Sequence, residues 1–277
     1  RHPDGAFRLM QYRGVHSIVT GGSSGIGRAL VDRLVDRGSD VSILALDDAD
    51  LEHVAADYAD AAGNIATYGV DVGDDKQVLA SVVDAVALHG PCDLLITSAG
   101  IVRPGRFLEL PEGEFEREMR VNYFGTLHAI RAVAPSMMER RSGRIAAVSS
   151  AAGLLGVFGY SAYGPTKYAV RGLCDVLRTE MKPHGVYVGC VFPTDVDTPQ
   201  FAGEQPFLPE ETKAIPGSVT PISADKVAAA ILRGIDRRRA NIFTDPTTTV
   251  LDRLVRVLPG LTQRWLDGKV AGAAKDR

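Results

Sequence analysis

A glycine-rich turn between an apolar run and an amphipathic segment constrains this chain more than any other feature. The apolar run covers residues 15–20, and apolar residues recur at helical spacing after the turn as far as Gly38. Glycine lets backbone amides approach a phosphate, and the N-terminus of a helix adds partial positive charge there. The segment therefore predicts a dinucleotide-binding turn, whereas glycines without this context would indicate only flexibility. The turn comprises Gly21, Gly22, Ser23, Ser24, Gly25, Ile26 and Gly27.

Short apolar runs alternate with helical segments along most of the chain. Parallel strands need crossover connections, so this alternation predicts an α/β Rossmann fold, a single domain with a doubly wound parallel sheet of about seven strands and helices on both faces. Strands are expected at residues 15–20, 41–46, 65–70, 93–97, 144–149, 186–192 and 242–243. Helices are expected at residues 29–37, 48–62, 74–89, 112–140, 161–182 and 223–237, with Pro135 bending or ending the fourth.

The predicted catalytic domain spans residues 14–245, between an N-terminal extension, residues 1–13, and an amphipathic helical tail, residues 246–277. The proline-rich residues 193–221 are expected to form a long mobile loop over the site. Two interpretations of the tail stay open. It packs on its own domain, covers the substrate site or joins a subunit interface, or it lies peripherally on an anionic membrane.

Composition excludes several functional classes. A net charge of −3 gives no reason to expect a nucleic-acid partner. The three cysteines, Cys92, Cys174 and Cys190, are widely spaced, so we expect neither a disulfide framework nor a metal site and favour a reducing, cytoplasmic location. No apolar run is long enough for a transmembrane helix, and residues 1–14 lack the apolar core of a signal peptide.

Tyr163 and Lys167 are the strongest candidates for chemistry. They are four residues apart on a predicted helix and so share one face. A free tyrosine has a pKa of about 10, and a nearby ammonium stabilises the phenolate and lowers that pKa. Ser150 ends a strand before Tyr163, where its hydroxyl could bond a substrate oxygen. Asn122, a polar residue among apolar neighbours, could hold a water that relays protons to Lys167.

Two acidic positions bear on the cofactor. Asp71 follows the third predicted strand and could accept a hydrogen bond from an adenine amino group, or could cap a helix. Asp47 lies near the end of the second strand, and neither Leu46 nor Ser24 is basic. A carboxylate suits a free ribose hydroxyl, so NAD(H) is slightly favoured over NADP(H), although Asp47 could also be an ordinary helix cap.

From about residue 14 to residue 245 the chain resembles the short-chain dehydrogenase/reductase family in the order and spacing of these motifs. The resemblance implies that Asn122, Ser150, Tyr163 and Lys167 form a catalytic tetrad. It also implies that Lys167 binds the nicotinamide ribose, that Val196 and Thr198 contact the carboxamide or phosphates, and that the protein is a homodimer or homotetramer. The implied cofactor contacts are Gly21, Ser23, Ser24, Gly25, Ile26, Gly27, Asp47, Asp71, Val72, Ala99, Gly100, Tyr163, Lys167, Pro193, Val196 and Thr198.

Departures from the family pattern point to a subgroup. Thr97 and Ser98 replace two asparagines, and Thr194 followed by Asp195 stands where a glycine is usual. These positions resemble the 3-ketodihydrosphingosine reductases, which reduce a long-chain ketone with NADPH, although the lack of a basic residue at Leu46 argues against that cofactor here. The apolar substrate pocket would be lined by Phe158, Tyr160, Phe201, Phe207 and Leu208.

Two alternatives remain at this stage. The chain could be an oxidoreductase of the same family that acts on a steroid, a polyol or a small carbonyl compound. It could also be a non-catalytic nicotinamide-sensing or scaffold protein, which would have no chemical reason to keep the tetrad.

Overall fold

The computed structural model describes residues 11–46, 49–58, 63–214 and 221–275, and it contains one seven-stranded sheet. All strand pairs in that sheet are parallel, and the order is β3-β2-β1-β4-β5-β6-β9. The predicted doubly wound fold is confirmed. The strands are β1 (His16–Thr20), β2 (Asp40–Ala45), β3 (Ile65–Gly69), β4 (Leu94–Thr97), β5 (Gly143–Val148), β6 (Val186–Phe192) and β9 (Asn241–Phe243).

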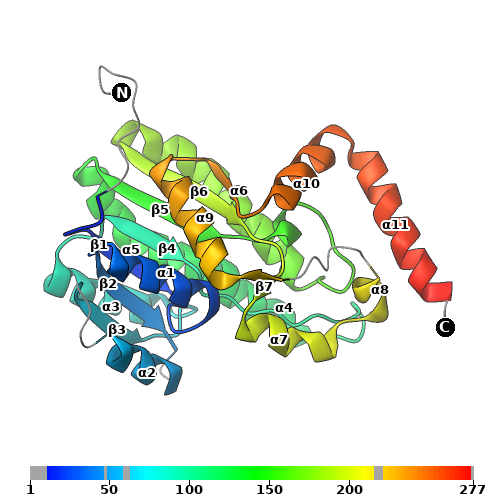
Figure 1. The fold of residues 1–277 in the computed structure, drawn as a ribbon, viewed down its shortest axis with the longest axis horizontal. Helices are drawn as coiled ribbons and strands as arrows, with labels where there is room; N and C mark the ends of the chain where they lie inside the picture. Colours follow the sequence, from blue (N-terminus) through cyan, green and yellow to red (C-terminus); the bar gives the residue numbers. More distant parts are fainter. Residues whose placement is uncertain (1–10, 47–48, 59–62, 215–220, 276–277) are drawn as a thin grey trace.

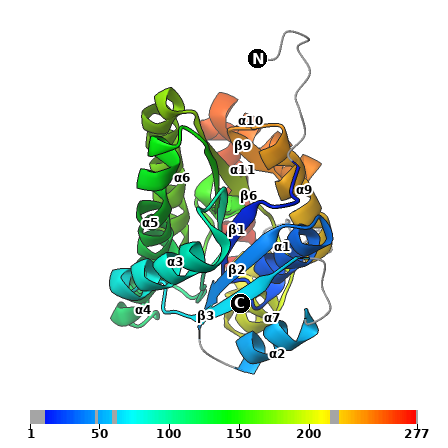
Figure 2. The same ribbon diagram turned by 90° about the vertical axis from the view of Figure 1, so that its left-hand side faces the viewer.

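Helices cover both faces of the sheet (Figures 1 and 2). One layer holds α1 (Gly25–Asp36), α2 (Ala49–Asp57) and α9 (Ala224–Asp236), and the other holds α3 (Asp75–His89), α5 (Gly125–Glu139) and α6 (Tyr163–Met181). Along β1, Val19 packs into the first layer and Ile18 into the second. Because side chains alternate across a strand and both faces are covered, every residue of β1 is buried.

The long helix predicted at residues 112–140 is interrupted, although not where the sequence suggests. It consists of α4 (Glu112–Glu118), a π-helical turn (Met119–Phe124) and α5. Pro135 lies inside α5, which continues to Glu139. The irregular part is the π-helical turn, which contains Asn122, and such turns often occur at functional sites.

The segment after β6 is more ordered than the predicted loop. It forms β7 (Val196–Asp197), α7 (Pro199–Glu204), a 3-10 turn (Gln205–Phe207) and α8 (Glu210–Lys213), and β7 pairs with β8 (Ile222–Ser223). Thr198 caps α7 by accepting a hydrogen bond from the amide of Phe201 at 3.2 Å. The sequence predicts one long mobile loop for residues 193–221, whereas these residues form short helices and strands; residues 215–220 lie outside the described part.

The tail contains two helices, α10 (Pro246–Val257) and α11 (Pro259–Lys275), which form an arm at one end of the molecule (Figure 1). Asp245 caps α10 by accepting from the amide of Thr248 at 2.9 Å, and Pro259 starts α11. The arm turns back so that α11 contacts α8. In the described residues, no helix has both the length and the apolar character needed to cross a membrane.

Candidate active site

A cavity of about 910 Å³ opens at the carboxyl ends of the strands. The strand order reverses between β1 and β4, and ligands of open α/β sheets bind outside the strand ends at such a switch point. Its walls come from the glycine-rich turn, the ends of β4, β5 and β6, helices α6 and α7, and the arm formed by α10 and α11. The fold therefore brings distant segments of the chain to one site.

The glycine-rich turn is tightly packed. Gly21 has a φ of +67°, and a Cβ placed on it would lie 2.7 Å from the Cα of Ala99. A Cβ on Gly27 would lie 2.0 Å from the carbonyl oxygen of Gly21. The Ser24 side chain makes no capping hydrogen bond at the start of α1. Ser24 thus leaves the first amides of α1 free of a capping side chain, as a phosphate-binding helix terminus requires.

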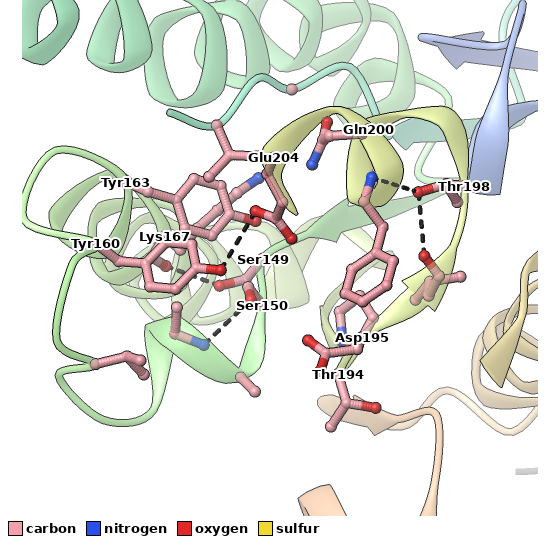
Figure 3. Close-up of a pocket in the computed structure, with 18 of the residues that line it drawn as sticks. Ser149, Ser150, Tyr160, Tyr163, Lys167, Thr194, Asp195, Thr198, Gln200 and Glu204 are labelled. Carbon is pink, nitrogen blue, oxygen red and sulfur yellow. Dashed lines mark hydrogen bonds between the residues drawn. The ribbon is translucent and has the colours of Figure 1, made fainter. Parts of the chain in front are cut away.

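Tyr163 and Lys167 both line the cavity, one helical turn apart (Figure 3). The Lys167 Nζ lies 5.4 Å from the centre of the Tyr163 ring and donates to the carbonyl of Val148 at 3.2 Å. Ser150 follows β5, and its Oγ accepts from the amide of Ala152 at 3.1 Å. The Ser150 hydroxyl also lies close enough to Tyr163 to lower the pKa of its phenol. Three of the four predicted tetrad residues therefore meet in one place.

Asn122 lies next to these three residues, but its side-chain amide is hydrogen-bonded to the backbone of Ile101. Its Oδ1 accepts from the amide of Ile101 at 2.8 Å, and its Nδ2 donates to the Ile101 carbonyl at 2.9 Å and to Thr166 Oγ1 at 3.1 Å. A Cβ on Gly100 would contact both Asn122 Oδ1 and Lys167 Nζ, at 3.2 and 3.4 Å. The Asn122 amide therefore fixes the segment after β4 against α6, and both of its N–H donors are already used.

The electrostatics of the pair differ from the sequence expectation. Burial raises the pKa of Tyr163 above its ordinary value, a hydrogen bond from Ser150 lowers it, and nearby carboxylates, Glu204 first, raise it. Burial also lowers the pKa of Lys167 to about 8. The expected acidification of the phenol by Lys167 does not dominate here. The phenol is instead held in its neutral form, which is the form that can donate a proton.

Most predicted cofactor contacts line the cavity, namely Gly21, Ser24, Gly25, Ile26, Gly27, Ala99, Gly100, Tyr163, Lys167, Pro193, Val196 and Thr198. Ser23, Asp71 and Val72 are not among its lining residues, and Asp47 lies outside the described residues. Asp71 accepts from the amide of Gly73 at 2.8 Å, which closes a turn. Leu46 directly follows β2, and 60% of its surface is exposed.

The residues that line the substrate end of the cavity differ in part from the predicted ones. Tyr160, Phe201 and Leu208 line it, but Phe158 and Phe207 do not. The Phe207 ring instead lies 3.3 Å from the guanidinium of Arg103. Val250, Leu251 and Leu254 also line the cavity, which agrees with one of the two interpretations of the tail. Four further lining residues were not predicted, namely Asp195, Glu204, Trp265 and Leu266. Asp195 carried a signal, because it departs from the family loop, but Glu204 falls in a segment that looked structureless.

Comparison with families and curated proteins gives one consistent result. A family model described as short chain dehydrogenase matches residues 16–207. The chain is 38% identical to the 3-dehydrosphinganine reductase of Danio rerio over 229 residues, 81% of this chain and 69% of that protein. It is 37% identical to the 3-ketodihydrosphingosine reductase of Dictyostelium discoideum over 269 residues, 90% of this chain and 79% of that protein.

Solved structures share the fold. A short-chain dehydrogenase from Sphingobium yanoikuyae in complex with NADPH has a TM-score of 0.76 and 27% identity, with 90% of this chain and 95% of that chain covered. A short chain dehydrogenase/reductase from Burkholderia phymatum in complex with NAD has a TM-score of 0.82 and 24% identity, with 92% and 97% covered.

Proposed function

The chain belongs to the short-chain dehydrogenase family and is an NAD(P)-dependent oxidoreductase, and from that premise we propose that it reduces the ketone of a long-chain 3-keto sphingoid base. The observation that carries this proposal is the meeting of Tyr163, Lys167 and Ser150 in a cavity whose far wall is apolar. The scaffold hypothesis gives no reason for this arrangement of proton-transfer groups.

The far wall supports a long-chain substrate. It is built by α10 and α11, which contribute Val250, Leu251, Leu254, Trp265 and Leu266. A 3-keto sphingoid base carries a ketone, an amine on the adjacent carbon, a terminal hydroxyl and a long alkyl chain. Burying that chain against aliphatic and aromatic side chains is favourable, whereas a polyol would leave the same wall without partners. We therefore assign the tail to covering the substrate site.

The reaction follows from the hydrogen bonds already in place. When bound, the nicotinamide supplies the hydride that attacks the carbonyl carbon. Ser150 Oγ accepts from the Ala152 amide, and its hydroxyl lies beside Tyr163. In this proposal the Ser150 hydrogen turns to a substrate oxygen held between the two hydroxyls. Tyr163 then donates its proton to that oxygen. Lys167, with a pKa of about 8, can return a proton to the phenolate.

NAD(H) is the preferred cofactor in this proposal. A 2′-phosphate on the adenine ribose needs a cation near the end of β2. Leu46 is an exposed leucine there, and Ser24 is not basic. The nearby Arg28 is engaged, because its guanidinium contacts Asp57 at 2.8 Å and Asp32 at 3.2 Å.

A substrate panel tests both parts of the proposal. Purified enzyme is supplied with NADH or NADPH and with 3-ketosphinganine, a 3-ketosteroid, a ketose or a small ketone, and absorbance at the reduced nicotinamide band is followed. The proposal expects the highest kcat/KM with 3-ketosphinganine and NADH. A higher kcat/KM with the steroid, the ketose or the small ketone contradicts the assigned substrate, and a preference for NADPH contradicts the cofactor assignment.

A further inference from the structure

Two carboxylates face the cavity beside the reacting groups (Figure 3). Asp195 comes from the segment between β6 and β7, and Glu204 is the last residue of α7. Both act electrostatically on Tyr163, the proposed proton donor. Acidic side chains in a largely apolar cavity are costly unless something compensates their charge.

Glu204 is hydrogen-bonded to Tyr160, whose ring lies next to that of Tyr163. Its Oε2 accepts from the Tyr160 hydroxyl at 3.3 Å, and the Tyr160 ring centre lies 5.8 Å from that of Tyr163. The Tyr160 ring also offers a π face, which is favourable to a cation. A group bound at Glu204 would therefore sit close to a carbonyl held at Tyr163.

The part of the chain that the structure describes supplies no positive partner for either carboxylate. No Lys, Arg or His within it forms an ion pair with Asp195 or Glu204. The Asp195 backbone carbonyl accepts from the amide of Ile222 at 3.0 Å, but the Asp195 carboxylate accepts no hydrogen bond from the described residues. Of the lysines that line the cavity, Lys167 is bound to the Val148 carbonyl and Lys213 pairs with Glu210 at 2.8 Å.

Asp245 lines the same cavity, but its carboxylate is fully engaged in hydrogen bonds to neighbouring residues. It caps α10 and accepts hydrogen bonds from the Thr248 amide and from the hydroxyl of Thr194 at 3.2 Å. Asp195 and Glu204 have no such structural role. Burial raises the pKa of Asp195, and burial together with the charge of Asp195 raises the pKa of Glu204 to about 7. The two acids thus repel each other, and no cation in the described residues pairs with either of them.

We propose that Asp195 and Glu204 form the subsite for a substrate ammonium on the carbon adjacent to the ketone, so that the enzyme selects α-amino ketones over ketones without an amine. This inference rests on the proposed function and adds its specificity determinant. The ammonium would neutralise the pair, donate to both carboxylates and direct the adjacent carbonyl towards Tyr163 and Ser150. A divalent cation fits less well, because no group of three or more His, Cys, Asp or Glu side chains in the described residues could hold a metal ion.

The test compares two ketones that differ in the amine. Wild-type enzyme and the variants Glu204→Gln and Asp195→Asn are assayed with 3-ketosphinganine and with 1-hydroxyoctadecan-3-one, which has the same chain and no amine. We expect each variant to lose about 10- to 100-fold in kcat/KM for the amine, the size of a hydrogen bond to a charged group, and little for the other ketone. Glu210→Gln is the matched control, because Glu210 is exposed in the same segment and, among the described residues, forms an ion pair only with Lys213.

The outcomes separate this inference from the proposed function. If wild-type enzyme reduces both ketones with equal kcat/KM, or if the variants lower both equally, the ammonium subsite is overturned and the ketone reductase stands. If wild-type enzyme reduces neither, the proposed function fails.

Calorimetry then decides the subsite without turnover. Sphinganine and octadecane-1,3-diol are titrated into the wild-type enzyme and into Glu204→Gln, each with NADH present, because the reduced cofactor cannot oxidise either alcohol. Tighter binding of sphinganine that is lost in the variant supports the subsite, and equal binding of the two ligands by the wild-type enzyme overturns it. The wild-type comparisons stand even if a variant does not fold.

Discussion

The Lys167 ammonium lies 5.4 Å from the centre of the Tyr163 ring and is held there by the last carbonyl of β5, that of Val148. A carbonyl at the end of the sheet thus orients the Lys167 side chain, whereas Tyr163 is positioned by the first turn of α6. Because both anchors are buried main-chain elements, the pair enters the cavity already oriented for proton transfer.

Replacing Lys167 by methionine tests this arrangement. The variant keeps the apolar stem and removes the ammonium, so the phenolate left after proton donation loses its stabilising charge. We expect kcat to fall at least ~100-fold, the usual scale of positioned acid–base groups. Steady-state kinetics provide the measurement, with Lys226→Met on the exposed start of α9 as control. Equal losses in the two variants would argue against a specific role.

The pH dependence of substrate binding should report Glu204. Its pKa is about 7, raised by burial and by Asp195 and lowered by the Tyr160 hydrogen bond. Below that pH the group is neutral, and above it the carboxylate attracts an ammonium. The KM for 3-ketosphinganine should therefore fall as pH rises through about 7, and this fall should weaken in Glu204→Gln. A KM profile identical in the variant would show that another group titrates.

The buried carboxyl group of Glu118 should make the stability of the protein depend on pH. Glu118 is buried, its Oε1 accepts from the amide of Arg103 at 2.6 Å, and its Oε2 has no hydrogen-bond partner among the described residues. Burial raises its pKa from 4.5 to about 7. The stability that this shift contributes is present below pH 4.5 and is lost as pH rises through about 7.

Glu118→Gln removes that dependence. Relative to the wild type, we expect the variant to gain about 1–3 kcal/mol in unfolding free energy on going from pH 5 to pH 8. Urea denaturation at the two pH values measures the difference. A larger relative gain at pH 5 than at pH 8 would reverse the sign and contradict the assignment.

The glycine-rich turn is sensitive to a single methyl group at Gly27. An alanine there would place its Cβ 2.0 Å from the Gly21 carbonyl oxygen, so the turn must move. We expect a loss of about 1–3 kcal/mol in stability and much weaker binding of NADH by fluorescence titration. Gly113→Ala in α4 is the control, since nothing lies within 4 Å of its added Cβ. Unchanged NADH affinity in Gly27→Ala would contradict the role of the turn.

The sequence was sufficient for the sheet because its central strands, β1, β4, β5 and β6, are buried on both faces. Each strand is an apolar run bounded by turn residues, and the glycine-rich turn sets the chain direction at β1. The π-helical turn at Asn122 could not be predicted, because it depends on hydrogen bonds to Ile101 and Thr166, which belong to other elements.

The substrate end of the site was predicted less well. Its two acidic residues, Asp195 and Glu204, lie in a proline-rich segment. The composition of that segment indicated a loop, whereas tertiary contacts stabilise short helices and strands in it. The apolar wall comes from the tail, and periodicity shows that such a helix has an apolar face without showing what that face covers. Leu266 is an example, because it lines the cavity although the sequence gave it no special weight.

The most direct test of the account is turnover of 3-ketosphinganine by Tyr163→Phe, with NADH binding measured on the same preparation. We expect turnover to fall to background while NADH still binds, because only the proton-donating oxygen is removed. Turnover at the wild-type rate in this variant would contradict this expectation.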